Sequence, residues 1–236
     1  MASAADAVSI LWTLPRPMLL WLAPETPAMS AIARLGLIVA AFVLQTALLN
    51  AELPTAPENA QTRPSLIGQF LVAAPEMGDP RFERTVILIV QDDPGGALGI
   101  VVNRPVGEQP MASLLEAVGE KNADVKGSVR VFSGGPVQPE TGFVVHSAEY
   151  RLPETIAIND RLSVTSNVKI LRDIAVNSGP VKILIAFGYA GWGPQQLDHE
   201  IEAGAWATAE ADPALVFDAD RDKLWDDVWG RRTQRL

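Results

Sequence analysis

From Gly68 onward, the apolar residues come in short runs of strand length that are separated by turns containing Gly or Pro. The ranges 68–74, 85–90 and 97–102 are rich in aliphatic and β-branched residues, and each predicts a strand. The segment Asp92–Gly96 (DDPGG) between the last two predicts an antiparallel hairpin with a loop of about five residues. This succession of short runs predicts a domain built around a sheet.

The rest of the chain from residue 110 mixes further strands with helices. Strands are expected at 129–132, 142–146, 155–158, 181–187 and 214–217, and helices at 110–118, 166–176, 194–203 and 220–229. Strands outnumber helices and follow one another in consecutive runs, which favours the α+β class over strict α/β alternation. We therefore expect a single compact domain of mixed, largely antiparallel strands with several flanking helices.

An uncharged apolar run, Leu35–Leu49, precedes this domain. As a helix it would be about 22 Å long at ~1.5 Å per residue, which is short for a hydrocarbon core of roughly 30 Å but suits a signal peptide. An export signal, an uncleaved membrane anchor, a buried or surface-docked helix, and an incidental extension upstream of a true start at Met29 stay open as alternatives. We expect an N-terminal extension over 1–51, a Pro- and Ala-rich linker over 52–64, and the domain over 65–236.

The formal net charge of −9 bears on the class of partner. Affinity for nucleic acid comes largely from Lys and Arg that neutralise phosphates, so this charge disfavours nucleic acid as a partner. The basic residues Arg231, Arg232 and Arg235 cluster only at the C-terminal end, where such a group is usually a solvated tail. The chain has no cysteine, which excludes disulfides, thiolate metal sites and cysteine nucleophiles.

Four clusters combine glycine, proline and polar residues. They are Gly68–Phe82 (GQFLVAAPEMGDPRF), Gly95–Pro105 (GGALGIVVNRP), Ser133–Val137 (SGGPV) and Gly188–Leu197 (GYAGWGPQQL), the last of which continues through Glu200 to Trp206. In order and spacing, these clusters resemble the AlgH/YqgE family over essentially residues 66–230.

That resemblance implies a compact domain of mixed strands and helices, a regulatory role in gene expression, and a cytoplasmic location, with no established reaction or cofactor. The sequence departs from the family pattern in two places. Gln91-Asp92-Asp93 stands where family members commonly carry a His, and the upstream apolar run is an addition to the usual family start. This second departure suggests export to the periplasm or membrane anchoring, with membrane contact only through that segment.

The second and third clusters supply candidate site residues. Pro105 holds Arg104 in an extended geometry, so Asn103 and Arg104 project from a defined sheet edge. They form either a strand-ending turn or a pocket wall in which Arg104 binds an anionic group. Gly134 and Gly135 either present N–H groups to an anion or form a bend against which another backbone passes closely.

The fourth cluster places Tyr189 and Trp192 in a glycine-rich loop between a strand and a helix, with Gln195 and Gln196 near the start of that helix. It is either a polar binding loop or a structural loop with Trp192 packed as a plug. Together, these eight residues predict a groove for a protein partner or a small anionic ligand: Asn103, Arg104, Gly134, Gly135, Tyr189, Trp192, Gln195 and Gln196.

Catalytic signatures are scarce. The sequence has neither a Gly-x-Ser-x-Gly nucleophile elbow nor a Gly-x-Gly-x-x-Gly loop after a strand. Both histidines, His146 and His199, read as surface or half-buried residues, and Asp79 reads as a turn cap before Pro80. We therefore expect a binding or regulatory protein without a catalytic set, metal or cofactor. The alternative is an enzyme of an unrecognised, hydrolase-like type that uses the predicted groove.

Overall fold

The computed structural model describes residues 64–120 and 125–233. The apolar run 35–49 and the linker before Pro64 lie outside the described residues, so the expectations for both stay predictions. Within the described ranges, no helix combines the length and the apolar character that crossing a membrane requires.

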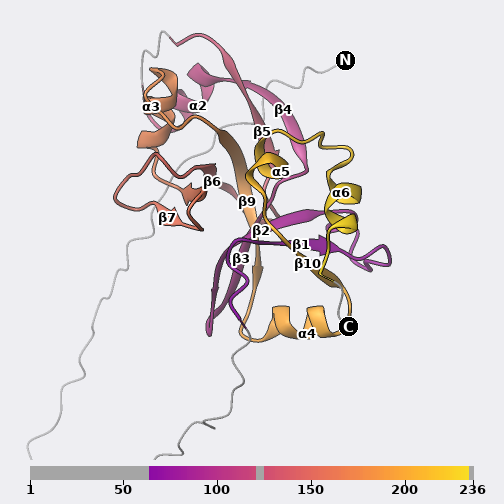
Figure 1. Cartoon of the computed structure of the whole chain (residues 1–236). Helices are drawn as coiled ribbons and strands as arrows, with labels where there is room; N and C mark the ends of the chain where they lie inside the picture. Colours follow the sequence, from indigo (N-terminus) through magenta and orange to yellow (C-terminus); the bar gives the residue numbers. More distant parts are fainter. Residues whose placement is uncertain (1–63, 121–124, 234–236) are drawn as a thin grey trace, which may run out of the picture. The chain divides into compact units, whose positions relative to one another are not determined.

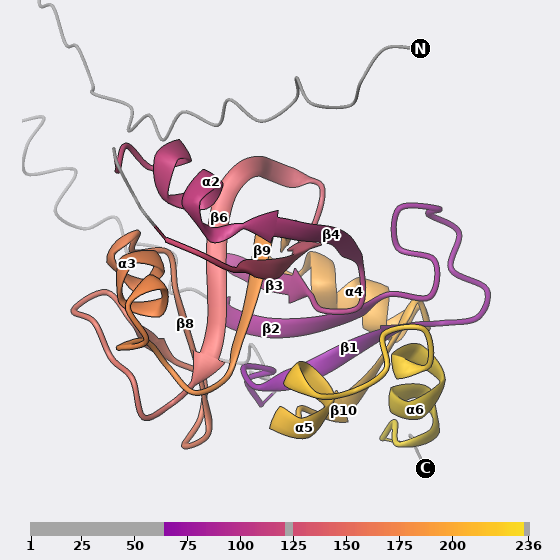
Figure 2. The same cartoon turned by 90° about the horizontal axis from the view of Figure 1, so that it is seen from above.

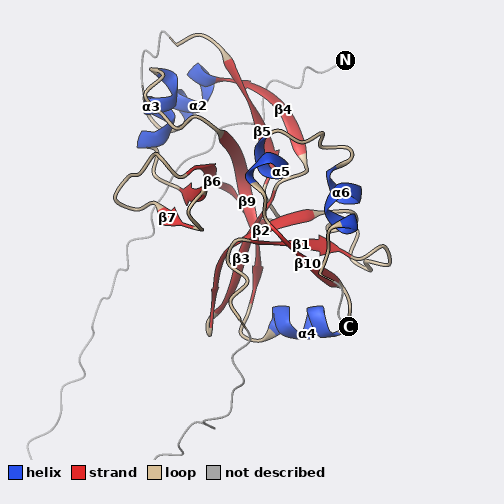
Figure 3. Ribbon diagram, viewed as in Figure 1, coloured by secondary structure: helices blue, strands red, loops and turns tan. Residues whose placement is uncertain are grey.

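The strands form one curled and mostly antiparallel sheet, which confirms the α+β prediction (Figures 1 and 3). The strand order is β10-β1-β2-β3-β9-β6-β8-β7, with β5 added to β9 and β4 added to β5. The strands are β1 (Gln69–Ala73), β2 (Val86–Asp93), β3 (Gly96–Val101), β4 (Pro105–Pro110), β5 (Ser128–Ser133), β6 (Val137–Ser147), β7 (Ile156–Ala157), β8 (Leu162–Thr165), β9 (Ile183–Trp192) and β10 (Trp206–Glu210). Among the strands of the described residues, β5 and β9 are the one pair that runs parallel.

Strand β9 joins the two halves of the sheet. Along one edge it pairs with β6, and along the other edge it pairs first with β5 and then with β3. Where β5 gives way to β3, the N–H of Gly134 donates to the carbonyl of Phe187 at 2.7 Å, and the N–H of Val101 donates to the carbonyl of Gly134 at 2.8 Å. The backbone at Gly134 therefore bridges β3 and β9.

In residues 64–120 and 125–233, the sheet is covered by five short helices: α2 (Met111–Ala117), α3 (Lys169–Ala175), α4 (Gln196–Glu202), α5 (Pro213–Phe217) and α6 (Leu224–Gly230). Helices α2 and α3 lie together at one end of the sheet, and α5 and α6 cover the face opposite α4 (Figures 1 and 2). Alternate residues of a strand point to opposite faces, so Phe70 packs with Trp225 of α6 while its neighbour Leu71 packs with Leu197 of α4. A third apolar cluster lies under α2 and α3.

The C-terminal helix α6 is held by a stack of arginine and tryptophan side chains. The rings of Trp225 and Trp229 are parallel, with centroids 5.5 Å apart, and the guanidinium groups of Arg84 and Arg232 lie 4.2 Å and 4.3 Å from the outer ring centroids. The indole N–H of Trp225 donates to a β1 carbonyl at 2.9 Å. Arg232 therefore packs on Trp229 within the protein, and this contact weakens the case for nucleic-acid binding by the C-terminal basic cluster.

Two local predictions were wrong. Residues 214–217 form helix α5 instead of a strand, because Asp212 caps the N-terminus by accepting from the N–H of Ala214 and Pro213 occupies the first turn. The β2–β3 loop is shorter than five residues, since Asp93 pairs directly with Gly96. Strands β4, β8 and β10 were missed.

Candidate functional site

A cavity of about 320 Å³ lies between helices α2 and α3 and the sheet beneath them. Alternation on the strands directs Val131 of β5, Val144 of β6 and Ile185 of β9 to the face that these helices cover. Leu114 of α2 and Leu171 of α3 line the cavity on the side opposite the sheet. The volume falls within the range of small-molecule pockets, roughly 300–1,000 Å³.

The cavity wall is apolar inside and polar at its mouth. Its buried side chains are mostly aliphatic, with Phe132 and Thr165 among them, whereas the exposed wall residues include Ser113, Ser133 and Ser166. Within the described part of the chain, these three hydroxyls and the amide of Gln109 make no side-chain hydrogen bond, so they are available to a ligand. No charged side chain belongs to the wall as far as the described residues go.

The charged residues of α3 pair with one another or with neighbouring groups around the cavity. Arg172 of α3 forms an ion pair with Glu120, three residues beyond the end of α2. Asp173 accepts from Lys169 and from the hydroxyl of Tyr150, both at 2.5 Å, and these hydrogen bonds hold the pKa of its carboxyl below the usual value. The pairs link α3 to its neighbours without contributing a charge to the cavity wall.

Next to the cavity, two buried side chains each leave one polar atom without a hydrogen-bond partner. His146 of β6 and Ser163 of β8 are register neighbours, one same-face step beyond Val144 and Thr165 of the cavity wall. Nδ1 of His146 lies 2.9 Å from the carbonyl of Ser147, whereas Nε2 and the Ser163 hydroxyl have no partner. The prediction of a surface or half-buried His146 was wrong: it is 0% exposed, and its burial lowers its pKa.

The predicted site residues at the second and third clusters have backbone-directed roles. The side-chain oxygen of Asn103 accepts from the N–H of Val86, and its amide donates to the carbonyl of Arg84, both at 2.9 Å. Arg104 donates to the carbonyl of Glu83 at 2.9 Å. Asn103 therefore joins the end of β3 to the start of β2.

The glycines of the third cluster are required by close packing of the backbone. A Cβ on Gly134 would lie 2.3 Å from the carbonyl oxygen of Gly188, and a Cβ on Gly135 would lie 2.1 Å from the carbonyl carbon of Tyr189. This confirms the reading of a bend against which another backbone passes. Tyr189 itself packs edge-on against Phe143, with centroids 6.0 Å apart.

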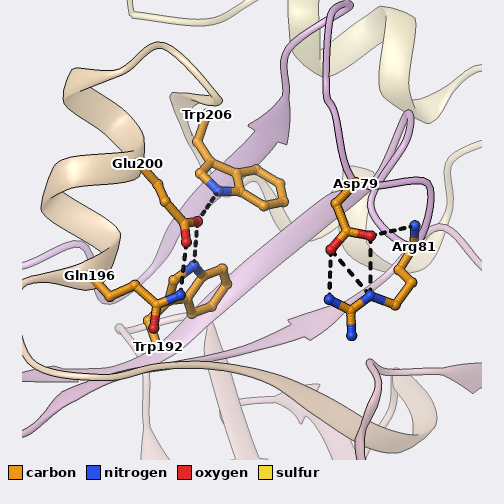
Figure 4. Close-up of polar contacts among 6 residues, drawn as sticks. All are labelled: Asp79, Arg81, Trp192, Gln196, Glu200 and Trp206. Atoms are coloured by element: carbon orange, nitrogen blue, oxygen red, sulfur yellow. Dashed lines mark hydrogen bonds and ion pairs between the residues drawn. The ribbon is translucent and has the colours of Figure 1, made fainter.

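In the fourth cluster, Glu200 of α4 collects three side-chain donors (Figure 4). One carboxylate oxygen accepts from the indole N–H groups of Trp192 and Trp206, at 2.9 Å and 2.8 Å, and the other accepts from Gln196 at 2.8 Å. Gln196 in turn accepts from the N–H of Gly193 at 3.0 Å. Trp192 is 7% exposed and so is packed, as the structural alternative expected. The prediction of a loop was wrong, because Tyr189 and Trp192 belong to strand β9, which continues to Trp192. Exposed Gln195 begins α4 in the left-handed region, at φ 60°.

The structure separates the eight predicted groove residues into two groups. In the β3–β9 register Ala97 pairs with Trp192 and Gly99 with Ala190, so Asn103 lies about six residues, or roughly 20 Å, along the sheet from Trp192. One group lies near one end of the β3–β9 contact and consists of Asn103, Arg104, Gly134 and Gly135, with Tyr189 beside Gly135. The second group lies at the opposite end and consists of Trp192, Gln195 and Gln196. None of the eight belongs to the cavity wall, and ligand binding by either group stays a prediction.

The remaining polar candidates are dispersed. Asp79 accepts from the backbone N–H of Arg81 at 2.9 Å and forms an ion pair with its side chain at 2.7 Å (Figure 4), which confirms the turn role. These hydrogen bonds lower the pKa of Asp79. His199 is exposed on α4. Across residues 64–120 and 125–233, no three His, Asp or Glu side chains gather as a metal site would require.

Sequence reasoning missed the cavity. The apolar faces of the predicted helices 110–118 and 166–176 were visible, but such faces normally indicate filled core. The wall combines residues of β4, α2, β5, β6, β8, α3 and β9. Whether these residues leave a space between them depends on how the elements pack in three dimensions.

Fold and cavity together define an α+β domain with one curled sheet and an apolar cavity under a helix pair. The AlgH-like family model matches residues 70–235. The chain belongs to the AlgH-like family, as the sequence motifs indicated.

Its relatives are bacterial proteins of similar length to the domain. A UPF0301 protein of Cereibacter sphaeroides is 42% identical over 161 residues, covering 68% of this chain and 88% of the relative. A UPF0301 protein of Rhodospirillum rubrum is 42% identical over 159 residues, covering 67% and 83%.

Two solved structures share the fold. The solution structure of the AlgH protein from Pseudomonas aeruginosa matches with a TM-score of 0.61 and 34% identity, covering 76% of this chain and 92% of that one. A crystal structure of a Corynebacterium diphtheriae protein matches with a TM-score of 0.57 and 25% identity, covering 73% and 90%.

Proposed function

We propose that this AlgH-like protein is a non-enzymatic binding protein whose ligand occupies the cavity under α2 and α3. The observation that carries the proposal is the cavity itself: about 320 Å³ of space with an apolar interior and unpartnered hydroxyl groups at its mouth. Close packing normally leaves few voids larger than a water molecule. Because the interior of this space is apolar, a ligand would gain free energy by burying apolar surface there.

A small uncharged dye whose emission depends on solvent polarity, 1-aminonaphthalene, matches the size of the cavity and tests the proposal by fluorescence titration. Ala117→Trp places a large ring in the cavity from α2, and Ser113→Trp narrows the mouth from an exposed position. The matched control is Glu116→Trp, an exposed residue of the same helix that does not line the cavity. Saturable dye binding that both cavity variants weaken and the control retains supports the proposal. Equal binding by all four proteins overturns it.

The regulatory role implied by the family resemblance fits this proposal if ligand occupancy controls contact with a partner protein. The charge of −9 disfavours the direct route through DNA. A gel-shift experiment at low ionic strength separates the two routes, because direct regulation requires salt-sensitive retardation of DNA. We expect none.

The alternative enzyme at the predicted groove has weaker support. The polar atoms of Asn103 and Trp192 already bind intramolecular partners, which leaves Arg104 as the freer group. Turnover of esters, amides or phosphoesters that is abolished by Arg104→Ala in a folded protein would favour the enzyme over the binding protein.

A further inference from the structure

The chemistry of the cavity wall constrains the class of ligand, provided that the cavity is the binding site proposed above. Its interior side chains, such as Leu114, Ile170 and Ile185, are buried and aliphatic. Liquid water occupies about 30 Å³ per molecule, so the cavity has room for roughly ten groups of that size. A ligand with an apolar body of about eight to ten heavy atoms fits this interior.

No charged side chain of the described wall offers a counter-charge to an ionised ligand. The nearest helix cations are already paired, Lys169 with Asp173 and Arg172 with Glu120. A carboxylate or ammonium group that gives up part of its hydration in such surroundings loses free energy unless it finds a partner. A charged ligand would therefore lose much of the free energy gained by burying its apolar part.

The mouth carries the hydrogen-bonding groups. Ser113 lies in the first turn of α2, Ser133 ends β5 and Ser166 follows β8, and all three are exposed. A hydroxyl group donates one hydrogen bond and accepts others, so these residues suit an uncharged alcohol, carbonyl or amide group. The arrangement matches a ligand that enters with its apolar end first and keeps its polar end at the mouth.

We infer that the cavity selects an uncharged amphipathic molecule, with an aliphatic body and a single hydroxyl, carbonyl or amide end, over its carboxylate counterpart. Selectivity arises from the absence of a counter-charge, while the aliphatic interior supplies affinity to both.

Displacement of 1-aminonaphthalene by 1-octanol and by octanoate at pH 7.5 tests this selectivity in the full chain. The two molecules have the same chain length and differ in the charge of the polar end. We expect octanol to displace the dye and octanoate to be weaker by at least about tenfold, the equivalent of 1.4 kcal/mol. Equal displacement by both molecules overturns the inference but leaves the binding proposal intact, whereas failure of the dye and of octanol to bind overturns the binding proposal itself.

A charge-insertion variant gives an independent readout. Ser113→Arg places a guanidinium group at the mouth, where it pairs with a carboxylate. We expect octanoate to bind at least about tenfold more tightly to this variant than to the wild type, with octanol affinity changed less than about threefold. The control, Ala112→Arg, adds the same charge to the same helix at a residue outside the cavity wall and is expected to leave the preference unchanged. If Ser113→Arg and Ala112→Arg raise the affinity for octanoate equally, the effect comes from the net charge of the protein, and the inference is overturned.

Discussion

The carboxylate of Glu200 anchors helix α4 to the sheet, and its removal provides a quantitative test of that role. The side chain accepts from Trp192 at 2.9 Å and from Trp206 at 2.8 Å, and these indoles are only 7% and 4% exposed. Substitution Glu200→Ala leaves two buried N–H donors without their acceptor. It also releases Gln196, which supports the turn before α4.

The magnitude follows from the two orphaned donors. A buried donor left unpaired costs about 1–3 kcal/mol, and hydrogen bonds to a charged group lie at the upper end. Glu200 is half-buried, so water reaches part of the space that its removal creates and lowers the total. We expect the free energy of unfolding to fall by about 2–5 kcal/mol and Tm by roughly 5–15 °C. Glu200→Gln keeps one acceptor oxygen and should cost about half as much.

Denaturant unfolding followed by tryptophan fluorescence measures the change. The control is Glu202→Ala, which makes the same substitution at an exposed position of the same helix and so has the same effect on helix propensity. In the folded variant, the indole N–H resonances of Trp192 and Trp206 should shift while the other indole signals stay in place. A Glu200→Ala protein within about 0.5 kcal/mol of the Glu202→Ala protein would refute the reasoning.

Three further substitutions test other parts of the structure. Burial lowers the pKa of His146, so protonation of this side chain favours the unfolded state, and stability should fall as the pH drops below about 6.5. In thermal melts, His146→Gln should lose less stability over this pH range than the wild type does. The control is His199→Gln, at the other of the two histidines in the sequence, which should lose as much as the wild type. Gly135→Ala places a Cβ 2.1 Å from the β9 backbone and should cost more than about 3 kcal/mol in denaturant unfolding, whereas Gly78→Ala, with nothing within 4 Å, should cost under about 0.5 kcal/mol. Asn103→Asp replaces a donor to one backbone carbonyl at 2.9 Å by an acceptor, and should raise the rate of amide exchange at the start of β2 and cost about 1–3 kcal/mol. A wild-type protein with equal stability at pH 7.5 and 5.5, or equal effects of the two glycine variants, would contradict the corresponding prediction.

Elements with a strong apolar pattern were predictable from the sequence. Strands β1, β2 and β3 lie within two or three residues of their expected bounds, because aliphatic runs separated by turn residues leave little choice of structure. The family-specific glycines were also predictable as a tight bend. Their exact partner, the backbone around Gly188, depends on how β5 and β3 share one edge of β9.

Weakly patterned elements were not predictable. Strand β10 (WATAE) and strand β4 (PVGEQP) carry few strand-forming residues, and pairing with β1 and β5 holds them in place. Residues 214–217 were assigned to a strand although Asp212 and Pro213 signal a helix start. An Asp N-cap followed by Pro in the first turn is a helix-start pattern that the sequence alone contains.

The candidate site was the least predictable part. The unusual composition of the glycine-rich clusters predicted a binding site there. In the structure, their glycines allow close backbone packing, and the Trp192 side chain bonds to Glu200 within the protein. The cavity is lined by ordinary Leu, Ile and Val residues that also occur in any core. Only the three-dimensional arrangement distinguishes a residue that borders a space from one that fills it.

The most direct test of the central claim is a titration of methyl-labelled protein with 1-octanol, followed by NMR. The account predicts saturable shifts of the methyl signals of Val144, Leu171 and Ile185 in the cavity wall, while those of Leu71 and Ile87 beneath α4 stay in place. Shifts confined to the methyl groups beneath α4, or no saturable shift at the cavity wall, would contradict the assignment of the cavity as the ligand site.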